Sequence, residues 1–114
     1  MSKVRFLISG FVIVLAWTVL AGKAAAFCSG TSCFDVQIGQ VYVANTGDVF
    51  ISVPDDVTQL SCTPVGNYIK LAAAHNNVDR IYAALLSLKL SSHPVRLVMV
   101  PGTGNCELDY IYWE

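Results

Sequence analysis

Four cysteines constrain the fold of this chain more than any other feature. Cys28, Cys33, Cys62 and Cys106 all follow a predicted export signal, and short exported domains are commonly stabilised by disulfides. Four cysteines allow three pairings. Cys28 and Cys33 enclose a short segment containing Gly30, so a local loop is easy to close, and we predict the pairs Cys28–Cys33 and Cys62–Cys106. The alternative is a metal site, but this cysteine spacing matches no zinc motif, and we predict no metal.

The first 26 residues, MSKVRFLISGFVIVLAWTVLAGKAAA, have the order of a secretory signal peptide. Two basic residues precede the apolar stretch 6–22, and the alanines 24–26 supply the small residues that signal cleavage requires. We predict cleavage after Ala26 and a secreted or periplasmic location. The alternative is an uncleaved membrane anchor, since the apolar stretch is longer than in most signals. No later stretch is apolar enough to span a membrane, so no span is predicted after cleavage.

Residues 27–114 are predicted to form a single domain. They keep four basic residues against all eight acidic ones, which gives a net charge of −4. This balance does not support a basic surface for nucleic acid or anionic lipid. Because a domain this short buries only about 60–65% of its unfolded surface, disulfides are expected to supply a large part of its stability.

Alternating apolar residues predict strands in the first half of this domain. The segment 36–45, VQIGQVYVAN, changes phase at Gly39–Gln40, which indicates a bulge or sharp coil. The turn sequence NTGD at 45–48 and the alternation over 49–53 predict a hairpin.

The second half is predicted to add a strand, a helix and two further strands. The short third strand covers either 60–63 or 68–71, and a helical period occupies 76–91. The last two strands, 95–100 and 108–113, carry apolar residues on both faces, which predicts burial or a subunit contact.

The loop PGTGNC, residues 101–106, superficially resembles a phosphate-binding loop. Such a loop requires a helix after its glycines, whereas a strand is predicted here, so we interpret it as a tight corner. Asp55 and Asp56 are interpreted as turn residues rather than paired catalytic acids. His75 and His93 flank the helix and form no catalytic triad. We therefore predict no enzyme and no cofactor.

Three aromatic residues of the last strand are candidate ligand contacts. Tyr110, Tyr112 and Trp113 could stack on a sugar, although strand aromatics more commonly fill a core or an interface.

Two segments carry a family resemblance. The stretch IYAALLSLKLSSHPVRLVMVPGTGNCELDYIY and the earlier LSCTPV resemble a family of small exported bacterial proteins, over roughly residues 36–113. More distantly, the pattern is similar to the binding (B) subunits of subtilase cytotoxin and of pertussis-like toxins. Their helix-to-strand junction reads GxPVRI, where this chain has SSHPVRL without the glycine.

The resemblance implies a five-stranded OB-like barrel of order β-β-β-α-β-β, glycan binding on the side of the barrel, and ring-shaped pentamers. By position, Thr31, Ser32 and Asp35 are the candidate ligand-binding residues. We therefore predict an exported, non-enzymatic binding module that binds glycans. The alternative is a periplasmic interaction or inhibitor protein whose ligand is another protein.

Overall fold

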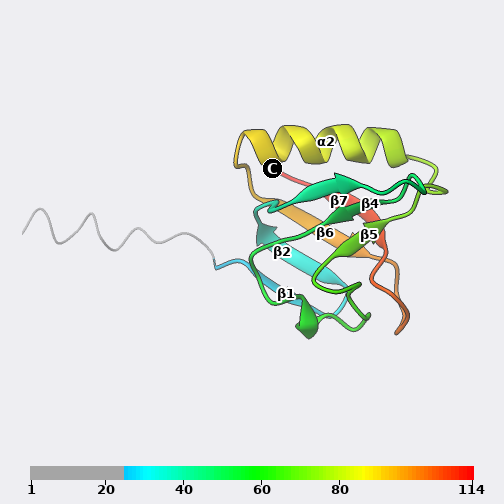
Figure 1. Cartoon of the computed structure of the whole chain (residues 1–114). Helices are drawn as coiled ribbons and strands as arrows, with labels where there is room; N and C mark the ends of the chain where they lie inside the picture. The colour runs from blue at the N-terminus through cyan, green and yellow to red at the C-terminus, as the bar shows by residue number, and fades with distance from the viewer. Residues whose placement is uncertain (1–24) are drawn as a thin grey trace, which may run out of the picture.

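A computed structural model describes residues 25–114 (Figure 1). The predicted signal peptide, residues 1–26, lies outside this range apart from its last two alanines. In chain order the elements are β1 (Phe27–Ser29), β2 (Ser32–Val36), β3 (Val41–Val43), β4 (Val49–Ile51), the 3-10 helix η3 (Val57–Gln59), β5 (Ile69–Leu71), α2 (Val78–Leu90), β6 (Val95–Met99) and β7 (Leu108–Tyr112). None of the helices between residues 25 and 114 is long and apolar enough to cross a membrane.

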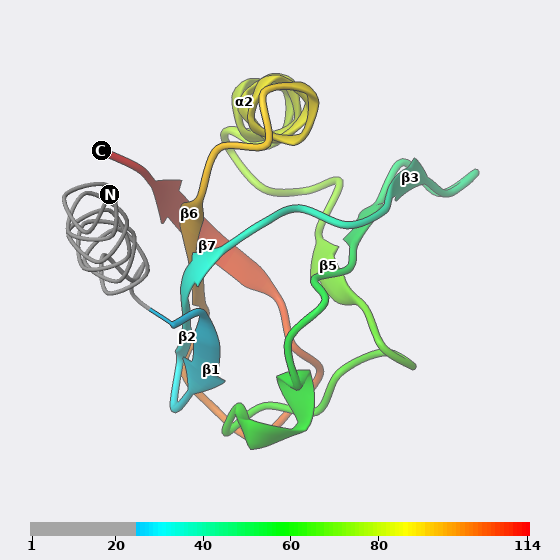
Figure 2. The same cartoon turned by 90° about the vertical axis from the view of Figure 1, so that its left-hand side faces the viewer.

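The strands form two antiparallel sheets, in the orders β1-β2-β6-β7 and β3-β4-β5. Figure 2 shows β1, β2 and β6 on one side of the domain, β3 and β5 on the other, and α2 above them. The fold is therefore mostly β with one α-helix in the described part of the chain, as the sequence predicts.

The predicted five-stranded closed barrel is not what the structure has. Seven short strands are present between residues 25 and 114, and the two sheets do not close into a barrel. The isolated bridge Lys70–Glu107 joins β5 of the smaller sheet to the residue before β7 of the larger sheet instead. The difference has two causes: an extra hairpin, β1–β2, precedes the predicted first strand, and that strand is interrupted at Gly39.

The interruption at Gly39 results from a close approach to Ser52. The Gly39 amide donates to the Ser52 carbonyl oxygen at 2.8 Å, and the Gln40 amide donates to Ser52 Oγ at 2.9 Å. A Cβ atom on Gly39 would lie 2.9 Å from Ser52 Oγ and 3.0 Å from Ser52 O. Any other residue would have to displace Ser52, so only glycine fits at this position. The sharp coil that the phase change predicts at Gly39–Gln40 is confirmed.

The predicted hairpin is also present. Tyr42 pairs with Phe50 at the centre of β3 and β4, and Gly47 in the connecting turn has a φ of +90°, which glycine adopts readily. The Asp48 carboxylate accepts a 2.8 Å hydrogen bond from the Ala73 amide. This bond lowers the pKa of Asp48 and ties the hairpin to the segment after β5.

The third strand occupies the second of the two predicted positions, as β5. The preceding segment begins with η3, whose N-cap is Asp56, and the Asp56 carboxylate accepts from the Thr58 amide at 3.0 Å. A carboxylate in this position satisfies an otherwise free helix amide, so Asp56 acts as a turn residue.

The helix α2 packs one face onto the sheets. Ile81, Leu85 and Leu88 are its buried residues, at the three- and four-residue spacing that one helix face requires. The N-cap residue, Asn77, makes no capping bond through its side chain. Its amide instead donates to His75 Nδ1 at 3.0 Å.

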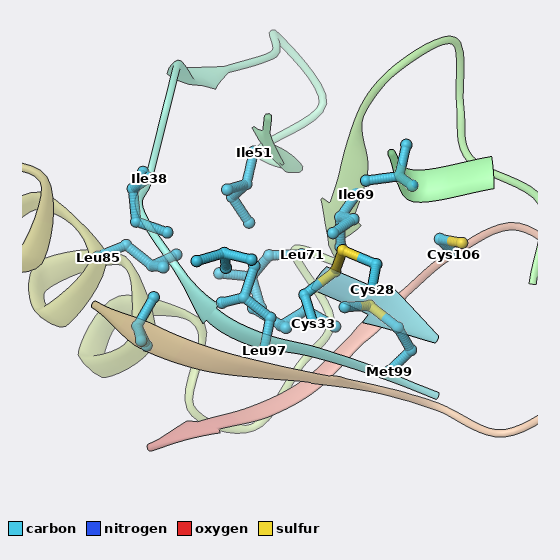
Figure 3. Packing of buried hydrophobic residues seen from close by; sticks show 14 of the residues in the cluster. Cys28, Cys33, Ile38, Ile51, Ile69, Leu71, Leu85, Leu97, Met99 and Cys106 are labelled. Atoms are coloured by element: carbon cyan, nitrogen blue, oxygen red, sulfur yellow. A yellow bond between two sulfur atoms is a disulfide. The ribbon is translucent and has the colours of Figure 1, made fainter. Parts of the chain in front are cut away.

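The core lies between the sheets and beneath α2. Figure 3 shows apolar side chains from both sheets and the helix pointing toward one another. Fully buried members include Ile51, Ile69, Leu71, Leu85, Leu97, Met99 and Leu108. Removing one such side chain typically costs about 2–5 kcal/mol.

Two disulfides stabilise the domain, and they join the pairs expected from the sequence. Cys28 and Cys33 are directly opposite in the β1–β2 hairpin, and Cys62 bonds Cys106 across 44 positions of sequence. The second bond is flanked by backbone hydrogen bonds, since the Cys106 amide donates to the Thr63 carbonyl at 2.7 Å.

Candidate binding site on the outer face of the four-stranded sheet

One row of side chains crosses the outer face of all four strands of the larger sheet. Phe27 of β1 stacks on Phe34 of β2, with ring centroids 4.8 Å apart. The Arg96 guanidinium carbon of β6 lies 4.2 Å from the Phe34 ring centroid and 5.2 Å from the Tyr112 ring centroid. Arg96 also donates a hydrogen bond to the Tyr112 hydroxyl. We call Phe27, Phe34, Arg96 and Tyr112 the outer row.

Register explains how these residues meet. Phe27 pairs with Phe34 and Arg96 pairs with Tyr112. On β6, Val95 and Leu97 are buried, so the alternation of a strand directs Arg96 to the opposite face. Cation–aromatic contacts of this kind contribute about 0.5–1 kcal/mol at exposed sites, so the row also stabilises the sheet.

A bulge in β2 places Asp35 beside this row. Cys33 pairs with Leu97 and Val36 pairs with Val95, so two residues of β2 lie opposite one residue of β6. Asp35 has a φ of +51°, which is unusual for a residue other than glycine. Bulges redirect side chains and are common beside functional sites.

A hollow of about 420 Å³ lies at this end of the row. We call it the outer hollow. Its lining residues are Phe34, Asp35, His93, Pro94, Val95, Arg96, Tyr112, Trp113 and Glu114. Its volume is within the range of small-molecule sites, about 300–1,000 Å³.

The end of α2 fixes His93 in the wall of this hollow. Ser92 has a φ of +52°, and the His93 amide donates to the Leu88 carbonyl at 3.0 Å. Helices commonly end in this way, with one residue in the left-handed conformation that turns the chain away from the helix. The His93 side chain then reaches the segment after β7, where Nε2 lies 2.7 Å from the Glu114 carbonyl oxygen.

The three residues selected from sequence lie in different surroundings. Asp35 is exposed and lines the outer hollow. Ser32 is buried within β2, and the Thr31 carbonyl accepts a 2.7 Å bond from the Met99 amide. The structure thus brings Asp35 together with the outer row. It places Thr31 in the β1–β2 turn and Ser32 in β2.

The last strand is less buried than expected. Only Leu108 of β7 is fully buried, whereas Tyr110, Tyr112 and Trp113 are each at least 41% exposed. These aromatic residues are therefore surface residues, available to a ligand or a partner.

His75 and the loop PGTGNC have structural roles. His75 Nε2 lies 2.7 Å from the Asp109 carbonyl oxygen, which connects the start of α2 to β7. In the loop, Gly102 has a φ of +134°, and the Gly104 carbonyl accepts from the Thr63 amide at 2.8 Å. The loop leads into β7 beside the Cys62–Cys106 bond, so it is a corner.

A second aromatic group lies on the outer face of the smaller sheet. Tyr42 stacks on Phe50 at 5.1 Å and meets Tyr68 edge-on at 5.2 Å. The Tyr68 hydroxyl donates to Gln40 Oε1 at 2.7 Å. This group contains no charged side chain, which distinguishes it from the outer row.

The sequence reasoning missed Phe34, Arg96 and His93. Arg96 had a detectable signal, since it is the one charged residue within an otherwise apolar strand. Phe34 and His93 had none, because their positions depend on the β2 bulge and on the ending of α2.

Comparison of the chain with known protein families, with curated proteins and with solved structures finds no match. Within residues 25–114, no three histidine, cysteine or acidic side chains are grouped closely enough to hold a metal ion.

Proposed function

We propose that this protein is an exported, non-enzymatic binding module for glycans, and that the outer hollow is its binding site. One observation carries the proposal: aromatic rings, a guanidinium and a carboxylate line the same open hollow. The apolar face of a sugar ring packs on aromatic side chains. Its hydroxyl groups bond to charged side chains, which form the stronger hydrogen bonds.

The arrangement of charges favours binding over catalysis. The Arg96 guanidinium is held between Phe34 and Tyr112, where it cannot act as an acid or base because arginine stays protonated. A rigid cation of this kind orients a ligand. Asp35, on the bulge, supplies an acceptor for sugar hydroxyls.

The OB-like order of elements, without a closed barrel, is part of the same proposal. Two features support it: α2 follows β5, which corresponds to the third predicted strand, and the bridge between Lys70 and Glu107 joins β5 to the start of β7 in parallel. The likeness to toxin binding subunits rests on this order and on the sequence segments given above. Export rests on the predicted signal peptide and agrees with two disulfides.

A glycan array with the oxidised protein of residues 27–114 tests the proposal. We expect a defined set of glycans to bind, and Arg96→Gln to weaken binding by about tenfold or more, since one lost charged contact is worth about 1.4 kcal/mol or more. Arg80→Gln is the matched control, because Arg80 is exposed on α2 and does not line the hollow. A folded parent protein that binds no glycan would refute the function.

A second candidate function is binding of another protein through β3. Within residues 25–114 this strand pairs only with β4, so its other edge has no strand neighbour. Tyr42 and Val43 on it are 45% and 51% exposed, and an exposed apolar edge can accept a further strand. A pull-down from periplasmic extract that captures one protein in equal amount, and loses it with Val43→Lys, would favour this candidate.

A further inference from the structure

We propose that the ligand is a chain of at least two linked sugar units, which occupies the outer hollow and a second hollow beside it. Trp113 forms the shared contact between the two units. This inference rests on the proposed glycan binding and adds the minimum length of the ligand.

The second hollow lies between α2 and the end of the chain. It measures about 490 Å³ and is lined by Ala84, Ser87, Leu88, Ser91, His93, Trp113 and Glu114. We call it the helix hollow. Three helix residues, Ala84, Ser87 and Leu88, and the C-cap residue Ser91 recur at three- and four-residue spacing, so they belong to one helix face. Most of them have small side chains, and this keeps the surface open.

Three residues belong to both hollows. His93, Trp113 and Glu114 line the outer hollow and the helix hollow alike. His93 and Glu114 are joined by the 2.7 Å contact between Nε2 and the Glu114 carbonyl oxygen. Trp113, which is 49% exposed, is a wall of each hollow. A ligand long enough to pass this wall therefore contacts both.

The two hollows differ in chemistry. The outer hollow is lined by Arg96 and Asp35. Because ionised side chains form the stronger hydrogen bonds, we expect the sugar unit that depends on such bonds to lie there. In the helix hollow the side chains contributed by α2 are uncharged. The Ser91 hydroxyl donates to the Ser87 carbonyl at 2.9 Å and keeps its acceptor capacity. We expect a neutral, hydroxyl-bearing unit there.

Trp113 also provides the readout. It is the only tryptophan of residues 27–114, so tryptophan fluorescence of the cleaved protein reports on this wall alone. The probes are methyl glycosides of common terminal sugars, each supplied as the monosaccharide and as its di- and trisaccharide. Fluorescence titration and calorimetry give the dissociation constant for each length.

We expect a disaccharide to bind about tenfold or more tightly than its terminal monosaccharide. Ser87→Tyr fills the helix hollow from an exposed helix position, so it should abolish this gain and leave the monosaccharide affinity within about twofold. Ala83→Tyr is the matched control, because Ala83 is exposed on α2 outside both hollows. It should keep the gain.

Two outcomes separate this inference from the proposed function. If monosaccharide and disaccharide bind equally, or if Ser87→Tyr binds the disaccharide as tightly as the parent, the two-unit site is wrong and glycan binding stands. If no glycan of any length changes the fluorescence or releases heat, glycan binding itself fails.

Discussion

At the scale of single residues, the candidate site depends on two residues whose backbone adopts the left-handed conformation. Asp35 and Ser92 have φ values of +51° and +52°, in a region that costs an ordinary residue about 1–2 kcal/mol. Asp35 projects from the bulge and lines the outer hollow. Ser92 redirects the chain so that the next residue, His93, lines the hollow and reaches Glu114 after β7.

Substitutions of Asp35 should separate the effect of backbone strain on stability from the effect of the carboxylate on glycan binding. We expect Asp35→Ala to be less stable than Asp35→Gly by about 1 kcal/mol, because alanine tolerates this φ poorly and glycine tolerates it well. Asp35→Asn should stay close to the parent in stability, since asparagine is also found in this conformation. All three should weaken glycan binding, because each lacks the carboxylate. Calorimetric melting and titration measure the two effects, and equal stability of the alanine and glycine variants would contradict the assignment of strain.

At the scale of elements, the break between β2 and β3 has a single steric cause. Gly39 approaches Ser52 so closely that the chain cannot carry a side chain there. Of the strand predicted over residues 36–45, Val36 therefore ends β2 in the larger sheet and Val41–Val43 forms β3 in the smaller sheet.

Gly39→Ala should lower the free energy of unfolding by about 1–3 kcal/mol, because the added Cβ atom overlaps Ser52 and forces the backbone to shift. Gly104→Ala is the control: its added Cβ would have no neighbour within 4 Å, so a change below about 0.5 kcal/mol is expected. Urea unfolding measures both. The steric explanation would be wrong if the two variants lost equal stability.

Local patterns were sufficient to predict some elements and not others. The helical period of Ile81, Leu85 and Leu88 and the turn around Gly47 were visible in sequence because neighbouring residues determine them. The outer row was not visible, because it requires the register of four strands. The three-residue strand β1 carries too little alternation to be recognised, and the bulge at Asp35 shifts the phase of β2. The two glycines of the loop at 101–106 were recognised as a corner, yet only Gly102 has a positive φ.

At the scale of the whole molecule, the two sheets depend on few direct connections. Outside the core, the Lys70–Glu107 bridge joins β5 to the start of β7, and the Cys62–Cys106 bond joins the segments that lead into these two strands. The disulfide closes a loop of 44 positions that contains β5, α2 and β6, so its loss removes a constraint on about half of residues 27–114.

Cys106→Ser should prevent accumulation of folded protein in an oxidising compartment. The chain-entropy estimate for this loop is roughly 4 kcal/mol, against roughly 2 kcal/mol for the short one, and small domains have only about 5–15 kcal/mol of net stability. The double variant Cys28→Ser with Cys33→Ser should therefore still fold. Yields of protease-resistant protein compare them. An equal loss of protease-resistant protein in both variants would show that loop length does not determine how much each disulfide stabilises the fold.

Exposed apolar residues on both sheets predict self-association. Tyr42 and Val43 on β3, and Tyr110 on β7, are each at least 45% exposed, and such surfaces commonly mark interfaces. We expect sedimentation of the cleaved protein to show an oligomer, with the pentamer as the species that the family resemblance implies. A monomer at high micromolar concentration would contradict this.

The disulfide pattern also bears on how the protein would mature during the export that its signal sequence predicts. The four cysteines bond as two consecutive pairs, the first with the second and the third with the fourth: Cys28 with Cys33, then Cys62 with Cys106. A chain that crosses a membrane from its N-terminus presents its thiols in the same order, so successive oxidation produces the native bonds directly. Thiol–disulfide exchange is slow, taking seconds to hours, and this order makes it unnecessary. An oxidase alone should suffice for maturation, and cells that lack a disulfide isomerase should export the native protein at an undiminished level.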